Sequence, residues 1–353
     1  MIFQKSLTAN SLDGAFNKQW KSVTESRQMV NNQSQGIARM AGRLDVNEGL
    51  IPRDVYQEFD NVTVQRFRSD DGDTFLNDLL PNSRSIGIGK LVQRYRRSSD
   101  AGTAQSSMGG QTGVKADQVQ YNYDGSIVPI HDVAFEREWR EWEGMKSEGF
   151  DALIDDQRES VATLRQHLAD SLLDGHKDKD GNLIVVDGLS WGGMRNDSRV
   201  AQADLSGSGL NFDFTDQTKT GDEIKNAFIQ LRNILLITND CAKDATYYVS
   251  RTIASNFERS FSLQYAGKNI MEELATLMGV KDVKVTNKLV GNQIMALVND
   301  SDAVRPVVGM GVNTVALARP NYNSKFVFVT WSATGWQVRT DHSNKTCAMY
   351  ASA

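Results

Sequence analysis

Residues 86–123, IGIGKLVQRYRRSSDAGTAQSSMGGQTGVKADQVQYNY, combine two alternating segments with a long polar middle. The first segment, 86–96, and the second, 117–123, each alternate apolar or aromatic positions with polar ones, which predicts two strands. About twenty residues rich in glycine and serine separate them, and loops longer than about 12–15 residues tend to be functional or disordered. We therefore expect a long hairpin arm that projects from its own body. Because an isolated two-stranded hairpin is marginal in water, a neighbouring subunit is the natural support.

Basic and aromatic side chains of this arm are the candidate contacts with a neighbouring subunit. The run RYRR at 94–97 could bind phosphates, but at the base of an arm we expect it to pair with an acidic patch on a neighbouring subunit. Near the tip, a lysine could form an isopeptide bond with a neighbour's asparagine, although the sequence shows neither that asparagine nor an activating carboxylate. The candidate inter-subunit residues are Arg94, Arg96, Arg97, Lys115, Tyr121 and Tyr123.

The composition is that of a globular protein, with 353 residues, 40% hydrophobic and 24% charged. Since cores usually split beyond about 250–300 residues, we expect two or three sub-domains. The net charge of −5 argues against a chain that coats nucleic acid through a basic surface. No apolar run is long enough for a signal peptide at the N-terminus or for a membrane span. These features predict a soluble, intracellular chain without membrane contact.

The N-terminal part of the chain is polar. Residues 1–50 cannot bury enough of their own surface, which predicts an arm that another surface must order. Pro52 suits the first turn of a short helix that would end at Phe59. The alternation in NVTVQRF, 61–67, predicts a strand.

The longest helical pattern begins near Phe150 and ends at Asp174-Gly175, where glycine supplies the left-handed cap. Its apolar positions keep one stripe at helical spacing, which we interpret as core packing. Upstream, Asp124-Gly125 predicts a turn after the arm. The stripe consists of Leu153, Ile154, Val161, Leu164, Leu168 and Leu172.

After residue 215 helices and strands alternate, which predicts a compact α/β unit of about 120 residues. The predicted helices are 222–236, 251–261 and 269–278, and the predicted strands are 246–249, 284–289, 293–299, 314–318 and 325–331.

Residues 176–187, HKDKDGNLIVVD, resemble an acidic calcium-binding loop. An EF-hand loop needs a carboxylate at its first position, where this chain has His176, and usually a glutamate at its last, where it has Asp187. The second half is β-branched instead of helical. A hairpin that turns at Asp180-Gly181 is the favoured interpretation, and no metal site or cofactor is predicted.

Other catalytic patterns are weak. The four histidines, His131, His167, His176 and His342, are scattered without metal-ligand spacing. Cys241 and Cys347 lie far apart without metal-type or disulfide-type spacing, so we expect a reducing compartment. Nucleophile elbows and complete phosphate loops are missing from the sequence. We expect no enzyme activity.

The order of these parts resembles the major capsid proteins of tailed bacteriophages, whose Hong Kong 97-type shell fold is shared with encapsulins. The local stretches that carry the resemblance are SIVPIHDVAFEREWRE (126–141), LADSLLDG (168–175) and VVDGL (185–189). The resemblance spans nearly the whole chain. It implies an α+β Hong Kong 97-type fold with an N-terminal arm, an extended E-loop hairpin, a P domain with a long spine helix, and an A domain.

The resemblance also implies the limits of these parts. They are an N-terminal arm at 1–50, a first part of the P domain at 51–85, an E-loop hairpin at 86–137, the P domain with spine helix and hairpin at 138–215, the A domain at 216–340, and a C-terminal tail at 341–353.

Three functions remain open at this point. The first is a structural subunit that assembles into hexamers and pentamers of an icosahedral capsid around double-stranded DNA. Its partners would be further copies of itself, a scaffolding protein, a portal and decoration proteins, with DNA held on the inner face without sequence specificity. Such a chain would assemble in the host cytoplasm and reside in the virion capsid. The alternatives are an encapsulin-like cellular compartment shell and a calcium-binding protein or enzyme.

Overall fold

A computed structural model describes residues 72–102, 104, 106, 108–109, 117–147, 152–262 and 265–353. The expected arm at 1–50, the helix from Pro52, the strand at 61–67 and the predicted contact residue Lys115 lie outside these residues. Contacts divide the chain into two compact units. One contains the described residues of 132–162 and 313–331, and the other contains those of 69–131, 163–312 and 332–353.

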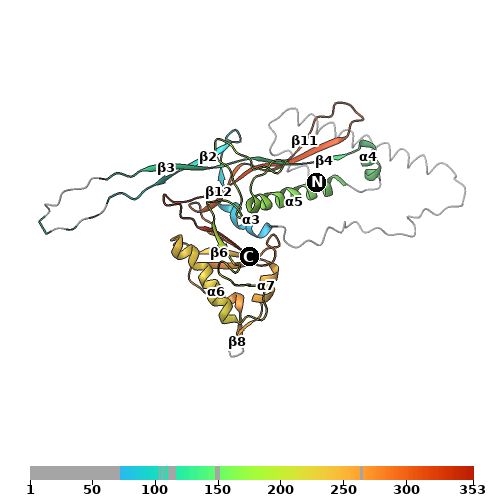
Figure 1. The fold of residues 1–353 in the computed structure, drawn as a ribbon. Coiled ribbons are helices and arrows are strands. Elements are labelled where there is room, and N and C mark those ends of the chain that lie inside the picture. The colour runs from blue at the N-terminus through green and yellow to red at the C-terminus, as the bar shows by residue number, and fades with distance from the viewer. Residues whose placement is uncertain are drawn as a thin grey trace, which may run out of the picture. The chain divides into compact units, whose positions relative to one another are not determined.

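A five-stranded sheet lies within the second unit (Figure 1). Its central strand β10 pairs antiparallel with β13 and β6, and each of these pairs parallel with an outer strand. In sheet order the strands are β5 (Ala201–Asp204), β13 (Ala348–Ser352), β10 (Gln293–Leu297), β6 (Ala245–Val249) and β9 (Val280–Val285).

The central strands of this sheet are buried on both faces, and alternate side chains enter two different cores. Tyr247 and Val249 of β6 belong to one hydrophobic cluster, whereas Tyr248 between them belongs to the other. A strand that is covered on both sides needs apolar residues throughout, as in TYYV. The predicted strand at 246–249 is thereby confirmed.

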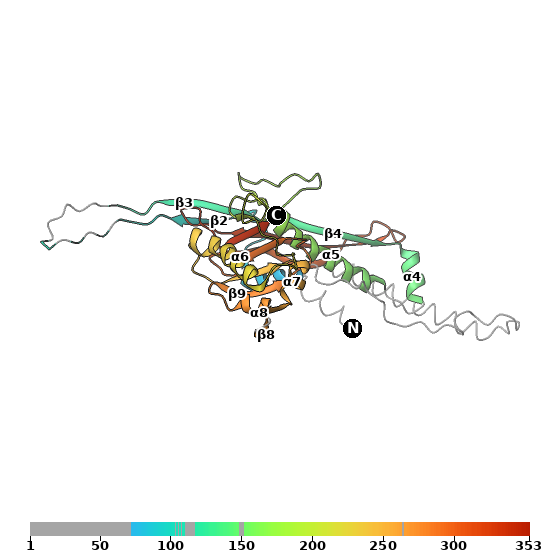
Figure 2. The ribbon, with the colours of Figure 1, turned by 60° about the horizontal axis from the view of Figure 1, so that its bottom comes forward.

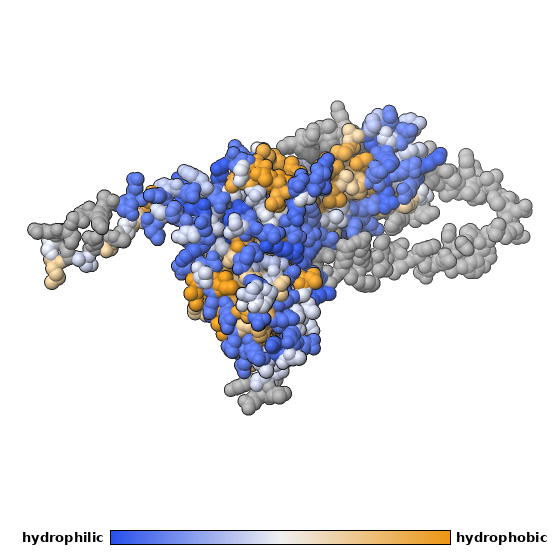
Figure 3. All heavy atoms as spheres, viewed as in Figure 1, coloured by the Kyte–Doolittle hydropathy of each residue, from blue (hydrophilic) through white to orange (hydrophobic). Residues whose placement is uncertain are grey.

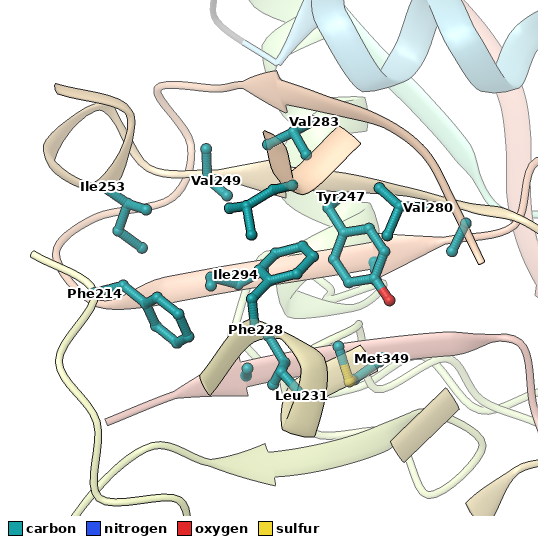
Figure 4. Packing of buried hydrophobic residues seen from close by; sticks show 14 of the residues in the cluster. Phe214, Phe228, Leu231, Tyr247, Val249, Ile253, Val280, Val283, Ile294 and Met349 are labelled. Carbon is teal, nitrogen blue, oxygen red and sulfur yellow. The ribbon is translucent and has the colours of Figure 1, made fainter. Parts of the chain in front are cut away.

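Helices α6, α7 and α8 pack against the sheet in the first cluster (Figures 2 and 4). Figure 4 shows Phe228 and Leu231 pointing from α6 toward the sheet, where the ring of Phe228 lies 4.8 Å from that of Tyr247. Thr220 begins α6 with a capping box to Glu223. The helices are α6 (Gly221–Asn233), which continues as a π-helical turn, η3 (Ile234–Thr238), α7 (Arg251–Phe257) and α8 (Ile270–Ala275).

The second cluster contains the C-terminal half of the long helix α5 (Ala152–Asp174) and helix α3 (Asp73–Leu79). Two buried indoles meet at Ser171 of α5: Trp191 donates to its carbonyl oxygen at 3.0 Å, and Trp336 donates to its hydroxyl at 2.9 Å. Gly175 follows the helix with φ of 88°, so the predicted end of the helix is confirmed.

A four-stranded sheet has the order β1-β11-β12-β4. In the first unit, an aromatic core joins it to helix α4, where the ring of Trp142 lies 4.5 Å from that of Phe326 and the ring of Phe135 stacks on Phe328 at 5.2 Å. The elements are β1 (Arg84–Ser85), β11 (Val304–Ala316), β12 (Phe326–Val338), β4 (Ile130–Arg137) and α4 (Trp139–Ser147). The 3-10 turn η2 (Leu80–Asn82) precedes β1, and a small hairpin, β7 (Ser260–Ser262) with β8 (Tyr265–Asn269), follows α7.

The predicted hairpin arm is present. Strands β2 (Val92–Ser98) and β3 (Tyr121–Ile127) pair antiparallel, with Val92 opposite Ile127 and Ser98 opposite Tyr121, and they run side by side in both ribbon views (Figures 1 and 2). Beyond the last strand residues, the Gly102 amide donates to the Asp117 carboxylate at 3.2 Å, so the two segments of the arm remain adjacent there.

Three local expectations for the arm were wrong. Residues 87–90 form a turn, in which the Lys90 amide donates to the Gly87 carbonyl at 2.9 Å, so the first strand begins at Val92 instead of Ile86. The second strand begins at Tyr121 instead of residue 117. Asp124-Gly125 lies within β3 instead of a turn. A Cβ at Gly125 would lie 2.9 Å from the Gln93 carbonyl oxygen, so cross-strand packing explains this glycine.

The stretch 176–187 forms the hairpin that was favoured over a calcium loop. Lys177 and Leu183 form an isolated antiparallel β-bridge, and Gly181 in the turn has a φ of 83°. The Asp178 carboxylate accepts from the amides of Asp180 and Asn182, both at 2.9 Å, so it closes the turn. Within the described part of the chain, no group of three or more histidine, cysteine or acidic residues could hold a metal ion.

The expectation for the cysteines was wrong. Cys241 and Cys347 form a disulfide with their Cα atoms 5.5 Å apart, although 106 positions separate them in the sequence. The bond joins the segment after η3 to the start of β13. Disulfides persist in oxidising surroundings, so the expectation of a reducing compartment loses its basis.

Gly335 of β12 provides a direct test of this packing. A Cβ at Gly335 would lie 2.0 Å from the Ile127 carbonyl oxygen. We expect Gly335→Ala to lower the free energy of unfolding by about 1–3 kcal/mol, because β3 and β12 must separate to admit the methyl group. Gly311→Ala in β11, where a Cβ would meet nothing within 4 Å, is the matched control. Equal unfolding free energies in urea for the two variants would contradict the assignment.

Candidate assembly surface

The base of the arm is fixed to the body of its own unit by Tyr95, which is 8% exposed. Its hydroxyl donates to the Asp124 carboxylate across the hairpin and accepts from the amide of Thr340, each at 3.1 Å. Burial raises the pKa of Tyr95, so the hydroxyl stays protonated and keeps both roles. This side chain therefore connects β2, β3 and the segment after β12.

Arg97 strengthens the same connection. Its Nη1 donates to the Thr340 hydroxyl at 2.9 Å and to the Asn344 side-chain oxygen at 2.8 Å. The disulfide at Cys347 lies three residues beyond Asn344 and restrains the loop that receives the arm. Arg97, predicted as an inter-subunit contact, thus has its hydrogen bonds within its own chain.

Arg199 holds the other strand of the arm, and the sequence did not single it out. Its guanidinium donates to the Gly125 carbonyl at 3.0 Å and forms a two-point ion pair with Asp197 at 2.8 and 2.7 Å. Burial opposes the charge of Asp197, but Arg199 and the Gly192 amide outweigh it and lower the pKa of Asp197. In the sequence, this ion pair appears only as an Asp-x-Arg spacing in a glycine-rich segment, and such a spacing is too common to predict a contact.

The face of the arm opposite to Tyr95 and Arg97 is exposed. Arg96 lies opposite Tyr123 in the strand register, and Tyr121 lies opposite Ser98, so these side chains share one face of the ribbon. Tyr121 and Tyr123 are 63% and 57% exposed, and Arg96 is exposed as well. The described part of the arm is mostly hydrophilic in Figure 3. Arg94, on the same face, forms an ion pair with Asp187 of the 176–187 hairpin.

Three of the four histidines, which looked scattered in the sequence, meet in the second unit. The ring of His131 from β4 lies 5.0 Å from that of His167 on α5 and 5.4 Å from that of His176. Nε2 of His167 and Nδ1 of His131 are 3.1 Å apart, within hydrogen-bond distance. His176 is 1% exposed, and within the described residues neither of its ring nitrogens has a hydrogen-bond partner.

None of the described helices is both long enough and apolar enough to cross a membrane.

Comparisons with known proteins place this chain in a family. Residues 45–351 match the profile of a family described as a family of unknown function, DUF6260. The chain belongs to this family. A search of curated proteins gives no match to this DUF6260 member.

Solved structures resemble the DUF6260 chain over most of its length. The capsid of Myoviridae phage XM1 has a TM-score of 0.63 at 14% identity, and the match covers 86% of this chain and 99% of the capsid chain. The capsid of a native GTA particle has a TM-score of 0.55 at 12% identity, and the match covers 87% of this chain and 98% of the capsid chain. A chain of Mycobacterium phage Che8 has 0.54 at 11% identity, with the same coverage. The expected α+β fold of the Hong Kong 97 type is thereby confirmed.

Tyr95→Phe tests the fixed base of the arm. The change leaves the buried Thr340 amide without its acceptor, and we expect the free energy of unfolding to fall by about 1–3 kcal/mol. Arg94→Ala removes an exposed ion pair of the same strand and should cost only about 0–1 kcal/mol. Denaturant unfolding of both variants measures the difference, and a larger loss in Arg94→Ala would refute this account of the base.

His176 predicts a loss of stability in acid. Burial, followed by the charges of His131 and His167, lowers the pKa of His176 well below its ordinary value of 6.5. As the pH falls past about 6.5, His176 therefore binds a proton in the unfolded chain but stays neutral in the folded chain. The contribution to stability is complete above that pH and falls as the pH decreases below it, by at most about 1.4 kcal/mol per pH unit.

His176→Leu should flatten the dependence of the unfolding free energy on pH between about pH 6.5 and 5. His342→Leu, at an exposed position, serves as the control. Unfolding curves at several pH values give the slopes, and an unchanged slope in His176→Leu would exclude this histidine as the source.

Proposed function

We propose that this chain is the structural subunit of an icosahedral viral capsid, which assembles into hexamers and pentamers around double-stranded DNA. The observation that carries the proposal is the arm, whose base is held by Tyr95, Arg97 and Arg199 of its own chain while its outer face stays exposed. A two-stranded ribbon is not stable alone, so a second copy is the natural support for the outer part. The likeness in fold to the capsids of phage XM1 and of the GTA particle supports the same function.

Within this proposal the parts have the following roles. The hairpin within 86–137 is the E-loop, the long helix α5 is the spine of the P domain, and the unit from 216 is the A domain. The sheet of the A domain also contains β5 and β13, so we propose that this domain includes 201–204 and 348–352 in addition to 216–340.

The proposed partners follow from a shell. They are further copies of the chain, a scaffolding protein, a portal and decoration proteins, with DNA on the inner face and the virion as the final location after assembly in the host cytoplasm. The net charge of −5 suits an inner surface that holds DNA without sequence specificity and without tight binding. The role requires no cofactor and no catalytic step.

Electron microscopy of the full chain, expressed alone and with its proposed assembly partners, tests the proposal. We expect closed particles that contain DNA. Particles that contain a co-purifying protein and no DNA would favour a cellular compartment shell. A chain that stays monomeric in every condition would contradict both shell functions.

A double variant tests the exposed face of the arm. Tyr121→Ser with Tyr123→Ser removes two exposed rings, and we expect particles to be lost while the free energy of unfolding changes by less than about 0.5 kcal/mol. Tyr322→Ser, at a tyrosine that is 87% exposed and lies outside the arm, is the control. Normal yields of particles from the double variant would count against contacts through this face.

A further inference from the structure

Two arginines, one in β11 and one directly after β12, donate to the same neutral oxygen. Arg305 of β11 donates from Nε to the side-chain oxygen of Gln337 at 2.9 Å, and Arg339 donates from its own Nε to the same oxygen at 3.3 Å. Gln337 is 1% exposed and Arg305 is 7% exposed. Two guanidinium charges therefore lie close together in a region with little access to water.

A third guanidinium belongs to the same face of the sheet. Arg84 of β1 pairs with Val307 of β11, two positions beyond Arg305, and side chains two apart on a strand point the same way. Strand β1 has only two residues and forms an edge of the sheet. Arg84 is exposed, so the cluster of Arg84, Arg305 and Arg339 opens to the outside at this edge.

Few negative charges lie beside the cluster. Among the described residues, Arg339 has one carboxylate partner, Asp302 at 3.6 Å, which is 73% exposed and also lies 3.9 Å from Lys243. Within the described residues, Arg84 makes no ion pair, and Nη2 of Arg305 is buried without a hydrogen-bond partner. Burial, followed by the charges of Arg339 and Arg84, lowers the pKa of Arg305. Buried guanidinium groups are normally paired, because an unpaired buried charge is costly.

We propose that the cluster of Arg84, Arg305 and Arg339 is a docking site for an aspartate or glutamate side chain of a second copy of this chain. A planar guanidinium binds a carboxylate through two parallel hydrogen bonds, which are stronger than bonds between neutral groups. An identical copy offers an excess of carboxylates, since the chain has 44 acidic and 39 basic residues. The inference rests on the proposed shell, in which copies lie side by side.

Zero-length cross-linking tests the proposal. Arg84→Lys places a reactive ammonium group at the rim of the cluster, where a carbodiimide-activated carboxylate can form an amide bond with it. Chains that carry nitrogen-14 are mixed with chains that carry nitrogen-15 before assembly, and the linked peptides are identified by mass spectrometry. We expect the peptide that contains position 84 to be joined to an acidic peptide of the other isotope.

Charge reversal gives an independent reading. Arg84→Glu should raise the concentration needed for assembly by at least about tenfold, since like charges would face each other across the interface. Arg251→Glu makes the same change at an exposed residue of α7 outside the cluster and should have little effect.

The outcomes separate this inference from the shell itself. If wild-type particles form but position 84 links only within its own chain, or if Arg84→Glu assembles as the wild type does, the docking site is overturned and the shell is not. If Arg84→Glu particles form normally and contain less DNA, the cluster contacts phosphate and the assignment to a carboxylate is wrong. If the unchanged chain forms no particle, the proposed function falls, and the docking site falls with it.

Discussion

The hydrogen bonds at the base of the arm are the constraint on which the proposed assembly depends. A two-stranded ribbon has no core of its own, so its direction is set only where the body of the protein holds it. Tyr95 holds β2, Arg199 holds β3, and both contacts use buried or half-buried groups, which makes them stronger than exposed pairs such as that of Arg94. A ribbon that is rigid at its base and exposed beyond it can present the same face to a neighbour in every copy.

The body that holds the arm is well suited to this role. The sheet that contains β6, β10 and β13 is buried on both faces, and the disulfide between Cys241 and Cys347 ties its last strand to the segment after η3. Thr340 and Asn344, which receive the arm, lie just before Cys347. The loop that holds the arm is therefore itself restrained, and movement of the arm at its base would disturb the core.

Local patterns predicted several elements, although not all of their bounds, and did not predict the contacts between distant segments. The end of α5 at Gly175 and the buried strand TYYV follow from short-range signals, and the structure has both. Asp124-Gly125 resembles a turn in sequence, but the opposite strand leaves no room for a Cβ at Gly125, and only the pairing reveals this.

The components of the site were harder to foresee, because they come from distant parts of the chain. The cysteines are separated by 106 positions, and no spacing rule covers that distance. The three meeting histidines come from β4, α5 and the segment after α5. The tyrosines of the arm stood out as aromatic residues in a polar segment, whereas Arg199 had no local signal at all.

Hydrogen exchange of the arm, measured in free subunits and in assembled particles, tests the central claim most directly. The amides near Arg94 and Gly125 should be protected in both states, because the chain itself holds the base of the arm. Those near Asp100 and Gln118, beyond the paired residues of β2 and β3, should exchange rapidly in the free subunit and slowly in particles. Equal exchange of the outer amides in the two states would show that no neighbour supports the arm, and would contradict the account.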